Sequence, residues 1–168
     1  MNTQKQILED DARKFITPTI DPSFLAEHNA VSFILAVDWL ETGEDNEKKI
    51  AYKTFENGDT QILLITKVTK NGHRTSEKEP ISEDAYKQFL ASSILHLEKR
   101  RYEFEYTQQG SVFAMKYDEF TESGLRILEV DAPTKEERDA FDPHNFPSDL
   151  DEVTGDIRYY GYRVADIV

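Results

Sequence analysis

The segment LEKRRYEFEY (residues 97–106) has the alternating pattern of a β-strand with two chemically different faces. Because successive side chains of a strand point to opposite sides, one face carries the aromatic residues Tyr102, Phe104 and Tyr106. The other face carries Leu97, Lys99, Arg101, Glu103 and Glu105. A charged face is ordinary where it meets water, and it indicates a binding site where it meets the interior.

Two later segments repeat this arrangement. In SVFAMKYDEF (111–120), Lys116 and Asp118 share a face opposite the aromatic and apolar side chains. In GLRILEVDA (124–132), Glu129 and Asp131 continue an apolar face. Acids that continue an apolar face are not typical of a strand whose charged side simply meets solvent.

The spacing of these charges suits phosphate and metal chemistry. Lys99 and Arg101 lie two apart on one strand, where Arg can bind a phosphate through two hydrogen bonds and Lys adds a point charge. Glu129 and Asp131 are side by side in the same way and offer the oxygen ligands that Mg²⁺ prefers. Cross-strand ion pairs on a solvated sheet face are the alternative, and periodicity alone favours that alternative.

Composition limits the classes of function. The chain has 168 residues, no cysteine and a formal net charge of −13. We expect one domain, no disulfide, and no nucleic-acid partner, because an acidic surface repels phosphate backbones. We find no apolar run of about 18 residues and no signal peptide, which predicts a cytoplasmic protein without a membrane segment. The acidity suits a basic protein partner, or it serves solubility alone.

Helices are predicted in three places. Residues 3–16 put Leu8, Ala12, Phe15 and Ile16 on one helical stripe, and Asp21-Pro22 starts a second helix, so residues 1–30 are predicted as a helical segment. Residues 82–95 form a helix capped by Ser82. A capping box, Thr134 with Glu137, starts a short helix near the end.

The remaining segments predict a meander of antiparallel strands that begins at Val31. Turns are indicated at Asn57-Gly58, at residues 70–73 and at Gln109-Gly110. The count is about seven or eight short strands, which usually curl into a barrel or a sandwich.

Five segments in chain order resemble the CYTH domain, the fold of the triphosphate tunnel metalloenzymes. LEKRRY resembles its Lys-x-Arg-Tyr strand, YDEF its Asp-x-Phe strand, and GLRILEVD its Gly-Leu strand with an acid-x-acid end. DEVTGDIRYYGYRVA is similar to its closing signature, and RTSEKEPISEDAYKQFL to the segment that leads into its middle helix. The resemblance covers residues 74–165.

The resemblance implies an α+β fold: a closed antiparallel barrel of eight strands with flanking helices, formed by residues 1–168 as a single domain. The charged strand faces would then line a tunnel. It implies a hydrolase of inorganic triphosphate or a nucleotide that depends on Mg²⁺ or Mn²⁺. By position, the phosphate would be bound by Lys53, Lys67, Arg74, Lys99 and Arg101. Glu129 and Asp131 would be catalytic and hold the metal together with Glu152.

The chain also departs from the family pattern. The family begins with a Glu-x-Glu-x-Lys strand; here the options are Glu9, Asp11 and Arg13, or Asp10, Ala12 and Lys14, and the helical stripe fits these residues better. Ala51 interrupts a basic strand, Gly161 stands where the family commonly has Asn, and Glu103 and Glu105 add negative charge beside the phosphate clamp. An alternative therefore stays open: a catalytically degenerate CYTH-like protein that binds a nucleotide or phosphate ligand, a basic protein partner, or a second copy as a homodimer.

Overall fold

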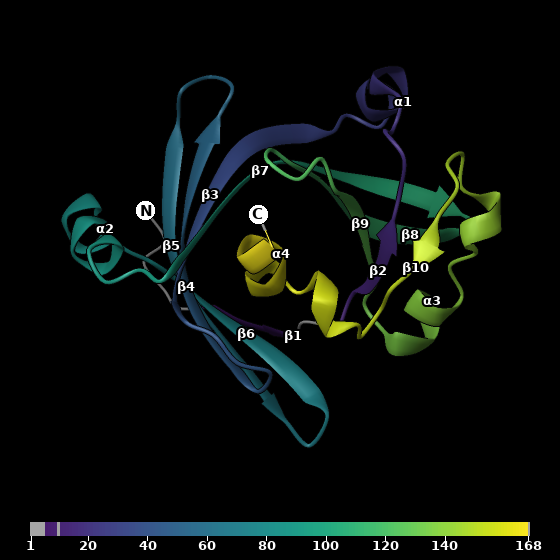
Figure 1. The fold of residues 1–168 in the computed structure, drawn as a ribbon. Helices are drawn as coiled ribbons and strands as arrows, with labels where there is room; N and C mark the ends of the chain where they lie inside the picture. Colours follow the sequence, from purple (N-terminus) through teal and green to yellow (C-terminus); the bar gives the residue numbers. More distant parts are fainter. Residues whose placement is uncertain (1–5, 10, 168) are drawn as a thin grey trace. The chain divides into compact units, whose positions relative to one another are not determined.

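A computed structural model describes the backbone of residues 6–9 and 11–167, and side chains from residue 11 to residue 165 (Figure 1). The chain divides into two compact units. Unit 1 is built around Ile34–Glu98 and includes the chain from Ile157 onward, and unit 2 combines Asp11–Phe33 with Lys99–Asp156. That residues 1–168 form a single CYTH-like domain stays a prediction.

The strands form an antiparallel sheet. In the described part of the chain the strand order is β1-β6-β5-β4-β3-β7-β8-β9-β2-β10. Unit 1 contributes β1 (Gln6–Glu9), β4 (Asn46–Phe55), β5 (Thr60–Lys70) and β6 (His73–Pro80). Unit 2 contributes β2 (Arg13–Ile16), β8 (Ser111–Phe120), β9 (Arg126–Asp131) and β10 (Asp151–Glu152). Residues of β3 (Val31–Glu41) and β7 (Leu95–Gln108) belong to both units. The order does not return to its start, so the predicted closed barrel is not confirmed.

The predicted helix over residues 3–16 is wrong, because its described residues form β1 and β2. A short isolated helix is marginally stable in water. As a strand, β2 instead pairs with β9 on one side and with β10 on the other. Phe15 lies opposite Leu128 in this pairing and is completely buried. In the predicted helical segment, only α1 (Pro22–Glu27) is helical among the described residues, and the Asp21 side chain accepts a hydrogen bond from the Ser23 backbone N–H.

The predicted hairpin turns are confirmed. Asn57-Gly58 joins β4 to β5, and Asn71-Gly72 joins β5 to β6 with φ angles of 54° and 75°. Positive φ at both central residues gives the turn the twist that a two-residue hairpin needs. Gln109-Gly110 does the same between β7 and β8, with φ angles of 50° and 81°.

The core of unit 2 lies on the aromatic side of β7, β8, β9 and β2. The ring of Phe141 packs edge-on against Phe15 and Phe113, with centroid distances of 5.7 and 5.3 Å. Tyr102 of β7 stacks on Tyr117 at 5.5 Å. Helix α1 adds Leu25 to this core, and Phe141 and Phe146 flank η1 (Pro143–Asn145). The aromatic face of residues 97–106 is therefore the core face.

In unit 1, the two faces of the sheet carry different partners. Helix α2 (Glu83–Leu90) covers one face, where Tyr86 packs against Tyr52 with the ring centroids 5.1 Å apart. The C-terminal segment, η2 (Ile157–Tyr159) and α4 (Gly161–Ile167), contacts the other face, where Tyr160 lies against Arg74 and Gly161 against Trp39. A Cβ at Gly161 would lie 2.9 Å from Trp39 Cζ2, so this departure from the family pattern has a steric reason.

We expect Ser82→Ala to lower the free energy of unfolding by about 1 kcal/mol, the usual cost of losing a helix N-cap. Ser82 Oγ accepts a hydrogen bond from the Ala85 backbone N–H at 3.1 Å, and the substitution leaves that donor without its cap. Urea denaturation measures the effect. Ser82→Asp is the matched control, because it keeps an acceptor at the cap and should retain the wild-type value.

Candidate functional site

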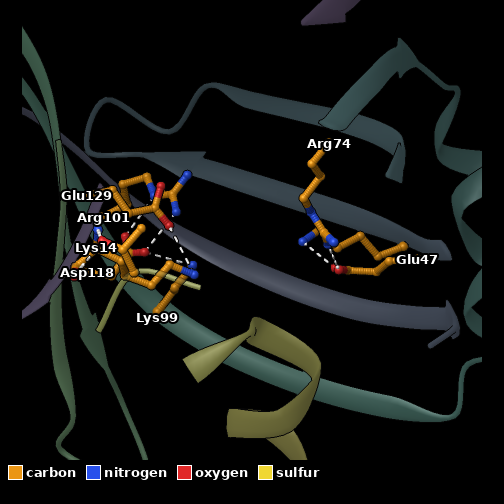
Figure 2. Close-up of polar contacts among 9 residues, drawn as sticks. Lys14, Glu47, Arg74, Lys99, Arg101, Asp118 and Glu129 are labelled. Atoms are coloured by element: carbon orange, nitrogen blue, oxygen red, sulfur yellow. Dashed lines mark hydrogen bonds and ion pairs between the residues drawn. The ribbon is translucent and has the colours of Figure 1, made fainter. Parts of the chain in front are cut away.

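Asp118 is the centre of a cluster of charged side chains in unit 2 (Figure 2). Lys99 Nζ donates to Asp118 Oδ2 at 2.8 Å. Arg101 donates twice, from Nε to Oδ1 at 2.7 Å and from Nη2 to Oδ2 at 2.8 Å. Arg101 thus binds the carboxylate through two parallel hydrogen bonds, the same arrangement that Arg uses to bind a phosphate.

Sheet register brings the other members of the cluster together. A cross-strand row runs from Glu103 through Lys116 and Glu129 to Lys14, one residue each from β7, β8, β9 and β2. Lys14 Nζ lies 4.0 Å from Glu129 Oε1. We define the Asp118 cluster as Lys14, Lys99, Arg101, Glu103, Lys116, Asp118 and Glu129.

The Asp118 cluster is not a solvated surface. The side chains of Lys99 and Arg101 are 11% and 13% exposed, and that of Asp118 is 2% exposed. Because these residues alternate with the aromatic core residues, they lie on the opposite face of the sheet from the core. The mixed-charge face of residues 97–106 is therefore buried at Lys99 and Arg101.

The protonation of this cluster follows from burial and neighbouring charge. Burial, reinforced by the charge of Arg101, lowers the pKa of Lys99 to about 8 although Asp118 opposes this. Burial would raise the pKa of Asp118, but Arg101 and Lys99 outweigh it and hold that pKa well below its usual range. Burial also opposes ionisation of Glu129, and Lys14 and Arg101 still lower its pKa.

A second cluster, in unit 1, surrounds Glu47 (Figure 2). Glu47 Oε1 accepts hydrogen bonds from Trp39 Nε1 at 2.9 Å and from Lys49 Nζ at 2.8 Å. Its Oε2 accepts from Arg74 Nη2 at 2.8 Å, and Lys67 lies opposite Glu47 in the β4–β5 register. We define the Glu47 cluster as Trp39, Glu47, Lys49, Lys67 and Arg74.

Glu47 stays ionised although its side chain is only 3% exposed. Burial would raise its pKa, but the charges of Lys49 and Lys67 outweigh burial and lower the pKa to about 2. The guanidinium of Arg74 also lies 5.0 Å from the ring centroid of Tyr160. In this unit too, therefore, a buried carboxylate is surrounded by basic side chains.

Four of the five predicted phosphate-binding residues fall into these two clusters. Lys99 and Arg101 converge on Asp118, and Lys67 and Arg74 belong to the Glu47 cluster. Lys53 lies on the same face of β4 as Glu47, beyond the buried Ala51, and pairs in register with Gln61. Lys99 and Arg101, the predicted phosphate clamp, share one face of β7 and both donate to the carboxylate of Asp118.

Each of the three predicted metal ligands contacts a different basic side chain. Glu152 binds Arg13, with Nε 2.8 Å from Oε2, and Arg13 lies on the core side of β2. Asp131 Oδ1 accepts from the Ala132 backbone N–H at 2.8 Å and lies 3.5 Å from Arg138 Nη1. Glu129 shares a face of β9 with Asp131, opposite the face on which Arg13 lies, and it is directed at Lys14.

The described carboxylates therefore do not form a ready-made site for a divalent cation. Among the side chains that the structure describes, no three His, Asp or Glu residues gather closely enough to hold a metal ion. Asp10, one of the options for the first family strand, lies outside the described residues. A Mg²⁺ or Mn²⁺ centre formed by Glu129, Asp131 and Glu152 has no support in this arrangement.

Sequence reasoning did not select Asp118, Glu47 or Lys14 as site residues. Asp118 had a usable signal, because a two-residue turn at Gln109-Gly110 places it directly opposite Arg101. Glu47 had no such signal, since it meets Lys67 and Arg74 only through the pairing of β4, β5 and β6. Lys14 was hidden by the helical stripe, and its role appears only once β2 pairs with β9.

Comparisons with known proteins support the fold. No protein-family model matches the chain, and no curated protein matches its sequence. The crystal structure of the inorganic triphosphatase NE1496 is similar, with a TM-score of 0.61 and 22% identity over 94% of this chain and 93% of that one. The similarity is therefore one of three-dimensional fold.

A second structure is more distantly similar. The PH1819 protein from Pyrococcus horikoshii OT3 matches with a TM-score of 0.52 and 19% identity, over 76% of this chain and 82% of that one. At these identities the likeness concerns the fold alone. In the part of the chain that the structure describes, none of the helices has the length and apolar character needed to cross a membrane.

Proposed function

We propose that this chain binds a triphosphate-bearing small molecule through the Asp118 cluster. The observation that carries the proposal is the pair of buried cations, Lys99 and Arg101, that converge on one carboxylate in a chain of net charge −13. Removing two cations and a carboxylate from water costs free energy that their mutual attraction often does not fully offset. Keeping these charges buried therefore favours a role in binding an anion. Arg101 could donate to two phosphate oxygens of a triphosphate the same pair of hydrogen bonds that it now donates to Asp118.

On binding, the ligand would replace Asp118 as the hydrogen-bond acceptor of Lys99 and Arg101. Phosphate oxygens would take hydrogen bonds from Arg101 and Lys99 that Asp118 now accepts, while Lys14 and Lys116 add positive charge from the neighbouring row. Lys53, Lys67 and Arg74 remain proposed phosphate contacts on unit 1. A protein partner or a homodimer remains an alternative.

Hydrolysis is the second candidate function. The observation that favours it is the similarity of fold to an inorganic triphosphatase. In that case Mg²⁺ or Mn²⁺ would be required, with Glu129 and Asp131 as the proposed catalytic acids, but the described carboxylates do not form a metal site. Ligand binding is therefore the function that the geometry supports best.

We expect Lys99→Met to weaken tripolyphosphate binding at least about tenfold, because it removes one buried positive charge and keeps the length of the side chain. Isothermal titration calorimetry measures the dissociation constant. Lys135→Met is the matched control: it makes the same change in net charge at a side chain that is 80% exposed on α3 (Lys135–Asp139). Equal weakening in both variants would show that overall charge, and not the Asp118 cluster, governs binding.

A phosphate-release assay with tripolyphosphate and nucleoside triphosphates, in Mg²⁺ or Mn²⁺, separates binding from hydrolysis. If the chain is a hydrolase, the wild type should release phosphate and Glu129→Gln should not. Binding without release above the Glu129→Gln level would remove hydrolysis and leave the proposed binding function intact.

A further inference from the structure

Two carboxylates of the Asp118 cluster, those of Asp118 and Glu129, contact basic side chains. Asp118 accepts from Lys99 and Arg101, and Glu129 lies 4.0 Å from Lys14. Both pairs are at least partly buried: the Lys14 and Glu129 side chains are each 21% exposed. To bind the carboxylate oxygens of Asp118 or Glu129, a metal ion would first have to displace a lysine or an arginine.

The net charge of the Asp118 cluster disfavours the binding of a divalent cation. Its four basic and three acidic side chains leave a net charge of +1, where a divalent cation is repelled and a polyanion is attracted. Burial strengthens both effects, because the local dielectric response is weaker than in water. Ala12, which precedes β2 by one residue, adds no side-chain oxygen.

We propose that the Asp118 cluster binds its triphosphate ligand without a divalent cation, and that Lys14 supplies beside Glu129 the positive charge that a metal ion would bring. This inference rests on the proposed binding function and specifies its ligand: the metal-free polyphosphate anion. Mg²⁺ lowers the negative charge of tripolyphosphate in solution, so it competes with the basic side chains for the same oxygens.

Calorimetry with tripolyphosphate, in EDTA and then in excess MgCl₂, tests the inference. We expect binding in EDTA and a dissociation constant at least about threefold larger in Mg²⁺, because the complexed ligand carries less charge. Binding that appears only in Mg²⁺ would overturn the inference and leave the proposed function standing. A lack of binding in both buffers would overturn the proposed function as well.

A metal-binding measurement that needs no ligand gives an independent readout. Mn²⁺ titration followed by electron paramagnetic resonance should show no tight site in the wild type. Lys14→Glu places a carboxylate opposite Glu129 and should create Mn²⁺ affinity, whereas Lys135→Glu, with the same charge change on an exposed side chain, should not. A tight Mn²⁺ site in the wild type that Lys14→Glu leaves unchanged would contradict the role given to Lys14.

Lys14→Met covers the case in which Lys14→Glu does not fold. This variant removes the charge without adding a carboxylate, so tripolyphosphate affinity in EDTA should fall about tenfold. Thermal unfolding verifies that each variant is folded at the temperature of the titration. Unchanged affinity in a folded Lys14→Met protein would count against the inference.

Discussion

Replacing Asp118 with Asn is expected to lower the free energy of unfolding by about 3 kcal/mol or more. The amide keeps the shape of the side chain and removes the charge that compensates Lys99 and Arg101, both largely buried. Breaking a buried ion pair by removing one partner is costly because the remaining charges cannot recover their hydration. Urea denaturation at neutral pH measures this loss.

The same variant tests the binding site. Without the internal carboxylate, Lys99 and Arg101 have to find another anion, so tripolyphosphate should bind Asp118→Asn more tightly than it binds the wild type. The rise in melting temperature on adding tripolyphosphate should therefore be larger for the variant, because a ligand that binds only the folded state stabilises it.

Glu119→Gln is the matched control for Asp118→Asn. Glu119 is the next residue of β8, its side chain points to the other face and is 34% exposed, and its Oε2 lies 3.8 Å from Arg126 Nε. Its replacement should change stability by about 0.5 kcal/mol at most. If tripolyphosphate shifts the melting temperature of Asp118→Asn no more than that of Glu119→Gln, Asp118 does not occupy the ligand's place.

Replacing Glu47 with Gln is expected to cost about 3 kcal/mol at neutral pH. The Glu47 carboxylate accepts hydrogen bonds from Trp39, Lys49 and Arg74, and Gln can satisfy only part of this set because its amide nitrogen is a donor. Lys49 and Arg74 would then lose their buried negative partner.

The Glu47 prediction has a pH signature. The pKa of Glu47 falls from 4.5 to about 2 on folding, so the folded state binds its proton less readily than the unfolded state does. The stabilisation is present in full above the unfolded pKa and is lost as pH falls toward the folded one. Between pH 6 and pH 3 the wild type should lose about 2 kcal/mol through this group.

Glu47→Gln should lack that share of the acid sensitivity. Urea denaturation of wild type and variant across this pH range measures the difference between their slopes. Glu79→Gln serves as control, since Glu79 is exposed on β6 and faces away from Glu47 in the strand register. Parallel pH profiles for wild type and Glu47→Gln would show that Glu47 is not held ionised as the contacts require.

The features that sequence reasoning predicted correctly depend on neighbouring residues. Alternation along residues 97–106 separates the aromatic and charged faces of β7, and the Gln109-Gly110 turn follows from two residues that accept positive φ. The caps at Ser82 and Thr134 depend on a side chain and a backbone N–H three residues away.

The errors lie where distant residues decide. Residues 13–16 suit a helical stripe locally, but pairing with β9 buries Phe15 and points Lys14 at Glu129. Burial gained across a sheet outweighs a weak local helical preference, since short helices gain most of their stability from packing. No local pattern could reveal this choice.

The amino-acid order alone was enough to establish that Lys99 and Arg101 share one strand face, because side-chain alternation is a property of the extended backbone itself. Only folding in three dimensions chose their partner. Register across β7 and β8 delivers Asp118 to both cations, and Lys14 rather than a metal-binding acid shell faces Glu129. Charge pairing depends on distance and burial, which residues far apart in the chain acquire only when the sheet brings them together.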